Sequence, residues 1–128
     1  MHTTCGLVVN ENEFFLKDDL IKYFSVLAPS DGEYKHNDLA ARPATERDRE
    51  SIVKNNFGGF ASVEEFMKAE PKNAHAHIQS ILCGNSVTMG VAEGKLVRGQ
   101  WQSVLFCDFD GPRANRKANV TIIVAKKR

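Results

Sequence analysis

Apolar residues follow two different spacings along the chain, and each spacing predicts a different kind of element. Residues 3–9 are an almost continuous apolar run rich in β-branched side chains, which predicts a buried strand. Between Phe14 and Leu27 apolar side chains return at helical spacing, so we expect an amphipathic helix that stops at residues 28–32. Shorter helices are expected over residues 46–55, 62–69 and 74–82.

Two of these helices carry local signals for their ends. Ser62 and Glu65 form a capping box, and Gly84 is the expected stop of the helix that begins at Ala74. Residues 33–48 are polar and irregular in pattern. A loop of this length inside a compact domain is often functional, so this segment is a candidate part of a site.

Strand-like alternation replaces the helical spacing after Gly84. Strands are expected at Ser86–Val91, Ser103–Phe109 and Asn119–Ala125, with turns at Glu93-Gly94 and Asp110–Arg113. Short connections favour antiparallel pairing, which predicts a C-terminal β-meander. With the helices placed before it, we expect an α+β fold of mixed or antiparallel sheets and a few helices, in a single domain over residues 1–128.

The composition of the 128 residues narrows the classes of function. The formal net charge is +1, which argues against a nucleic-acid or membrane-surface protein, because those partners select a basic excess. Three cysteines without CxxC spacing argue against a disulfide framework or a cysteine-built zinc site. No apolar run reaches about 20 residues and no signal pattern opens the chain, so the expected location is cytoplasmic.

Histidines and the polar residues near them are the best candidates for a functional site. On a helix His75 and His77 would point about 200° apart, whereas on a strand they would share a face, so the pair alone is a weak metal signal. Metal and acid–base sites are commonly built at the ends of rigid elements. Polar clusters lie at such ends here, beginning at His2, Asn10, His36 and Asn73.

Several motifs in a fixed order resemble one known family. They are HTTCGLVVNEN near the start, NAHAHIQSILCGNSVTMGV in the second half, and EGKLVRGQWQSVLFCDFDGPR after it. Together they resemble the YjbQ-like family, also called the secondary thiamine-phosphate synthase family. YKHNDLAAR resembles a further element found in the branch that carries NAHAH. The resemblance covers nearly all of the chain.

The resemblance implies a compact α+β fold, a homotrimer, and a cleft at or near a subunit interface that gathers the polar motifs. It also implies weak thiamine-phosphate synthase activity, which joins hydroxymethylpyrimidine diphosphate to thiazole phosphate and releases pyrophosphate; the physiological role of the family is unsettled. Carried over by motif, the catalytic candidates are His2, Glu11 and His77. The substrate-binding candidates are Thr3, Thr4, Asn10, Ser80, Trp101, Gln102 and Arg113.

Several departures from the family pattern bear on whether the site is complete. The family carries a strand, a helix and another strand before its histidine motif, whereas this chain begins at Met1 and is expected to be N-terminally short. Glu13-Phe14 stands where the family often has an Asp-Pro step. Gly90 replaces the usual proline, and Asp108 stands where glutamate is usual.

Three functions fit this set of residues. The first is a trimeric transferase-like enzyme in which a divalent ion, held by His2, His75 and His77, offsets the charge of a small phosphorylated substrate. Histidine favours zinc-type ions whereas magnesium favours oxygen ligands, so the residues leave the metal undecided. The second is a non-catalytic trimer that binds a metal or a small anion. The third is an interaction module in which the polar cluster is incidental.

Overall fold

The fold is described from a computed structural model, which places residues 2–42, 45–54 and 59–124. It confirms the α+β class, with four α-helices and two small antiparallel sheets among these residues. The elements in chain order are β1 (Cys5–Glu11), α1 (Phe14–Leu27), the 3-10 helix η1 (Lys35–Asn37), α2 (Glu46–Lys54), α3 (Val63–Ala69), α4 (Ala74–Cys83), β2 (Val91–Ala92), β3 (Lys95–Leu96) and β4 (Gln102–Asp108).

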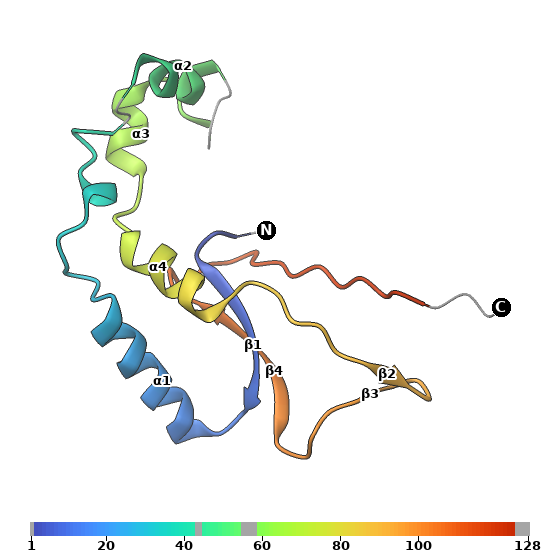
Figure 1. Ribbon diagram of the computed structural model, residues 1–128. Helices are drawn as coiled ribbons and strands as arrows, with labels where there is room; N and C mark the ends of the chain where they lie inside the picture. Colours follow the sequence, from blue (N-terminus) through green and yellow to red (C-terminus); the bar gives the residue numbers. More distant parts are fainter. Residues whose placement is uncertain (1, 43–44, 55–58, 125–128) are drawn as a thin grey trace.

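The centre of the molecule is an antiparallel ribbon of β1 and β4 with α4 lying against it (Figure 1). The Ser80 hydroxyl donates to the Cys5 carbonyl at 2.6 Å, and the Leu7 N–H donates to the Gly84 carbonyl at 3.0 Å. A Cβ at Gly6 would lie 2.5 Å from the sulfur of the last residue of α4, so only glycine permits this approach. These contacts place the C-terminal part of α4 beside the start of β1.

The predicted amphipathic helix is confirmed with the same limits, Phe14–Leu27. Glu13 caps it, because its carboxylate accepts two N–H groups of the first turn at 2.9 and 2.7 Å. Gln79 on α4 holds the other end, donating to the carbonyls of Phe24 and Ala28 at 3.0 and 2.9 Å. The two longest helices are therefore tied together by one buried amide.

The end signals of the shorter helices are also confirmed. The Ser62 hydroxyl accepts the N–H of Glu65 at 3.2 Å, and α3 follows it. The Glu65 carboxylate accepts the N–H of Ala61 at 2.9 Å, one residue before the partner that a capping box would give it. Gly84 ends α4 with φ 86°, in the region that favours glycine.

The predicted C-terminal β-meander is wrong. β4 pairs with the distant β1, and β2 pairs only with β3 across the expected turn at Glu93-Gly94. Of the strand expected at Ser86–Val91, only Val91 joins a sheet. Residues 119–124 join no ladder within the described part of the chain, and Ala125 lies outside it. Strand propensity favours an extended backbone, but a β-ladder also needs a partner strand. The sequence alone did not reveal which strand that is.

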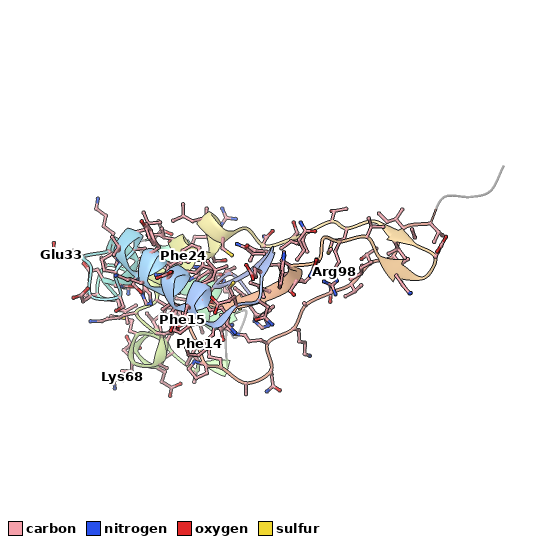
Figure 2. The ribbon with its side chains drawn as sticks, turned by 90° about the horizontal axis from the view of Figure 1, so that it is seen from below. Phe14, Phe15, Phe24, Glu33, Lys68 and Arg98 are labelled. Carbon is pink, nitrogen blue, oxygen red and sulfur yellow. The ribbon has the colours of Figure 1, made fainter. Side chains whose placement is uncertain are left out.

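The fold is open and leaves much apolar surface exposed. The accessible surface is 10272 Å², compared with about 6800 Å² for a compact monomer of this size. Phe14 and Phe15 lie exposed together at the start of α1, and the β2–β3 hairpin projects from the ribbon (Figure 2). Within the described residues, none of the helices has the length and apolar character needed to cross a membrane.

Candidate functional site

Two of the family motifs meet in one cavity, which we call the histidine cleft. Its volume is about 480 Å³, and its lining includes the predicted residues His2, Thr3, His77 and Ser80. His2 and Thr3 precede β1, whereas His77 and Ser80 project from the α4 face that lies against that strand. Asn85, just beyond α4, also lines the cleft, and sequence reasoning did not single it out. The Ser80 hydroxyl donates its hydrogen bond to the Cys5 carbonyl, so it can only accept hydrogen bonds from a ligand.

His2 is held although it lies at the beginning of the described chain. The N–H of Lys117 donates to its Nε2 at 3.1 Å. An imidazole nitrogen that accepts a hydrogen bond carries no proton, so neutral His2 has its proton on Nδ1. That nitrogen is the one available to a ligand in the histidine cleft. The segment after β4 therefore orients His2.

An ion pair fixes this segment to the start of β1. Arg116 donates to both carboxylate oxygens of Asp108, at 2.7 and 3.1 Å, and to the Thr4 hydroxyl at 3.3 Å. Burial by itself would raise the pKa of Asp108, but hydrogen bonds from Arg116 and from the N–H of Arg113 outweigh it and leave that pKa lowered. Thr4 is thus buried in a structural contact. Sequence reasoning missed Arg116, since its partner is set only by the β1–β4 register.

Arg113, a predicted ligand of substrate phosphate, is paired inside the protein. Its guanidinium contacts the Asp110 carboxylate at 2.8 Å and donates to the Asp110 carbonyl at 2.9 Å. The same carboxylate accepts the side-chain amide of Asn73 at 2.9 Å. Asp110 therefore connects the turn after β4 to the N-terminus of α4, and Arg113 holds its carboxylate. These contacts use Nε and Nη2 of the guanidinium, and the side chain is 46% exposed, so Nη1 could still donate to a phosphate.

The polar segment before α2 forms the wall behind His77. The rings of His36 and His77 meet edge to face, with centroids 4.9 Å apart. Arg42 contacts the Nε2 of His36 at 3.2 Å and donates to its carbonyl at 2.7 Å, while Glu70 pairs with Arg42 at 3.6 Å. Burial, reinforced by the charge of Arg42 and by His77, lowers the pKa of His36. Asn37 accepts the N–H of Ala74, the first residue of α4, at 3.1 Å.

His75 faces away from the histidine cleft. It lines a different cavity of about 790 Å³ between α1, α4 and the ribbon, and its Nδ1 is buried without a hydrogen-bond partner among the described residues. The divergence expected of a helix is therefore observed, and His2, His75 and His77 do not meet around one point. Across the residues that the structure describes, no group of three or more His, Cys, Asp or Glu side chains is arranged to hold a metal.

The remaining candidates lie at the opposite end of the β1–β4 ribbon. Glu11 pairs with Gln102 there, whereas Cys5 pairs with Asp108 at the end near the cleft. The two ends are about 20 Å apart, because each strand residue advances about 3.3 Å. Asn10 and Trp101 are neighbours of this far pair, and the Trp101 side chain is 66% exposed. A single copy of the chain does not bring Glu11, Asn10 or Trp101 to His77.

Known proteins resemble this chain over most of its length. The family model for the UPF0047 protein YjbQ-like family matches residues 1–125. The chain belongs to this YjbQ-like family. A UPF0047 protein of Archaeoglobus fulgidus is 35% identical over 115 residues, covering 90% of this chain and 67% of that protein.

Solved structures agree with this membership of the YjbQ-like family. A YbjQ-like protein of unknown function from Sulfolobus solfataricus matches with a TM-score of 0.60 and 28% identity, over 88% of this chain and 59% of that one. A YjbQ/UPF0047 protein from Clostridium acetobutylicum matches with a TM-score of 0.58 and 30% identity, over 88% and 62%. The chain thus spans roughly three-fifths of the length of these two YjbQ-like structures.

Proposed function

We propose that the histidine cleft binds a small phosphorylated substrate and that the assembled protein is a thiamine-phosphate-synthase-like transferase. The observation that carries this proposal is the meeting of His2 and His77 in one cleft, since these two imidazoles come from motifs 75 residues apart. Convergent polar groups in a concave site are the usual mark of small-molecule chemistry. The family resemblance supplies the reaction class.

The proposed reaction requires the protein to stabilise the negative charge of the departing pyrophosphate. The bond between the pyrimidine methylene carbon and the diphosphate oxygen breaks, pyrophosphate departs with the electron pair, and the thiazole nitrogen bonds to that carbon. Histidine side chains stabilise such a departure by donating hydrogen bonds or a proton to the phosphate oxygens. His2 through Nδ1, His77, and the amide of Asn85 are the groups that the cleft offers.

A divalent ion bound by three histidines does not fit one copy of the chain. His2 and His77 share the cleft, but His75 opens into the other cavity. An ion at His2 and His77 would need further ligands from the substrate or from another copy. We therefore derive no chemical step through a metal.

We further propose that a homotrimer completes the site. Glu11 and Trp101 lie about 20 Å from the cleft in one copy, along seven ladder pairs of the ribbon. A head-to-tail ring would bring this far end of one copy to the histidine cleft of the next. The exposure of Trp101 and the large apolar surface of the isolated chain support such an assembly.

Complementation between two inactive variants tests both parts of the proposal. His77→Ala and Glu11→Gln should each abolish formation of thiamine phosphate, whereas Glu33→Gln, an exposed change, should not. If the site lies between copies, the two inactive variants refolded together should recover about one quarter of wild-type activity, because both intact residues then meet at one interface in four. No turnover by the wild-type protein would refute the transferase, and no recovery in the mixture would refute a site shared between copies.

A non-catalytic anion-binding protein is the second candidate. It is favoured by the absence of any Asp or Glu among the described residues that line the histidine cleft, which leaves no carboxylate to act as a base. Calorimetric titration with pyrophosphate separates the two functions. Binding that is lost in His77→Ala, without turnover in any mixture, would favour this candidate.

A further inference from the structure

A line of polar residues runs behind His77 and is not accounted for by ligand binding in the cleft. It begins at Glu70, passes through Arg42 and His36, and continues to Asn73, which lies near the His36 ring. From Asn73 the line reaches Asp110, because the Asn73 side chain donates to that carboxylate at 2.9 Å. We call these residues the His36 network.

The position of the proton on His36 follows from its contact with Arg42. The Nη1 of Arg42 lies 3.2 Å from the Nε2 of His36. A guanidinium has only donors and stays charged, so the imidazole nitrogen must be the acceptor. His36 is therefore neutral in this arrangement and carries its proton on Nδ1, which is the less common tautomer of a free imidazole.

Asn73 provides the acceptor that this tautomer requires. It is only 7% exposed, and its Oδ1 has no hydrogen-bond partner at close range among the described residues. Its Nδ2 is already used by Asp110. The Asn73 side chain lies near enough to the His36 ring to favour a proton on it. A proton on the Nδ1 of His36 would give the Oδ1 of Asn73 the donor that it lacks. Without a donor, this buried carbonyl oxygen would lower the stability of the fold.

We propose that His36 is a positioning residue for His77, locked as the Nδ1–H tautomer between Arg42 and Asn73. The edge-to-face contact of the two rings transmits this fixed orientation to His77. The role assigned to His77 rests on the proposed function, whereas the tautomer of His36 rests on the network alone. His36 touches no substrate in this scheme and acts only through its neighbour.

The charges around His36 bear on its protonation. Arg42, His77 and Glu70 are the titratable groups that face it, and Arg42 disfavours a second positive charge beside its own. Arg42 therefore favours the neutral ring, whose Nε2 accepts its hydrogen bond.

Nitrogen NMR of the full chain with ¹⁵N-labelled histidine rings tests the tautomer directly. In the wild type, His36 should show a protonated Nδ1 and an unprotonated Nε2 at pH 7, with its signals assigned from their loss in His36→Phe. Arg42→Ala should move the proton to Nε2, and Arg42→Lys should retain the Nδ1–H form in part. Arg47→Ala, an exposed arginine of α2, is the matched control and should change nothing.

A functional measurement on the same variants tests the positioning role. Arg42→Ala should lower kcat for thiamine phosphate formation roughly tenfold with little change in KM, because His77 is present but less well oriented. Arg42→Lys keeps the experiment decisive if the alanine variant does not fold. An Nε2–H tautomer of His36 in the wild type would overturn the inference. An unchanged kcat in a variant whose His36 tautomer has changed would overturn it as well. A wild-type protein without turnover would defeat the proposed function, and pyrophosphate affinity would then replace kcat in judging His36.

Discussion

Replacing Arg116 with alanine tests how the start of β1 and the end of β4 are held together. The variant loses two charge-assisted hydrogen bonds to Asp108, at 2.7 and 3.1 Å, and a weaker one to Thr4. The Arg116 and Asp108 side chains are only 14% and 18% exposed, so water replaces the lost donors poorly. At about 1.5 kcal/mol for each charge-assisted bond, we expect a loss of about 3 kcal/mol in the free energy of unfolding.

Urea unfolding followed by circular dichroism measures this loss, with Lys54→Ala as the control. Lys54 pairs with Glu50 at 2.9 Å, but both side chains are more than half exposed, so removing that pair should cost no more than about 0.5 kcal/mol. The pKa of Asp108 is lowered in the folded state. Its contribution is thus present above the ordinary carboxyl pKa, and the gap between wild type and Arg116→Ala should shrink below about pH 4. Equal losses in the arginine and lysine variants would refute the reasoning.

The same change should reach the candidate site. Arg116 precedes Lys117, whose N–H orients the His2 ring. Loss of the anchor should free that ring, and ¹⁵N spectra of His2 would then show a mixture of tautomers. Unchanged His2 signals in Arg116→Ala would mean that the segment is held by other contacts.

Four further predictions concern packing, hydrogen bonding and titration. Gly6→Ala should cost about 2 kcal/mol in thermal unfolding, because the new Cβ would lie 2.5 Å from the sulfur of Cys83, whereas at Gly99 the nearest atom is 3.5 Å away and the same change should be mild. Gln79→Leu should speed amide hydrogen exchange in the last turn of α1 and cost about 2 kcal/mol, since it removes the amide that donates to the Ala28 carbonyl and the second donor of the Phe24 carbonyl. Stability should fall as the pH drops below about 6.5 towards the lowered pKa of His36, because the unfolded chain gains the proton first; His36→Phe should flatten this dependence in urea titrations. Burial beside another thiol raises the pKa of Cys83 to about 12, so at pH 8.5 iodoacetamide should alkylate it much more slowly in the folded protein than in urea, as peptide mass spectrometry would show.

The sequence located the helices well because their signals are local. The apolar spacing from Phe14 to Leu27, the Ser62 cap and the Gly84 stop each act within one or two turns, and all three are observed. The sequence also marked residues 33–48 as a candidate part of a site, and His36 within them lies against His77. The opposite directions of His75 and His77 followed from helical geometry alone.

The pairing of strands that are distant along the chain could not be predicted from local sequence signals. The alternating pattern of residues 119–124 indicates an extended backbone, but the strand that joins β4 is β1, about a hundred residues earlier in the chain. Arg116 was overlooked for the same reason, since a lone arginine in a polar stretch carries no local sign of a partner. The family motifs did name the polar residues, yet they could not show that Glu11 and His77 lie at opposite ends of one ribbon.

The sequence by itself determined the fold class, the helix limits and the family, and it named candidate side chains for a site. Only the tertiary structure decided that His2 and His77 share a cleft, that His75 lies elsewhere, and which groups contact the rings of His2 and His36. The physical reason is range: periodicity, caps and turns involve neighbours along the chain, whereas a cleft or a tautomer depends on contacts between residues far apart in sequence.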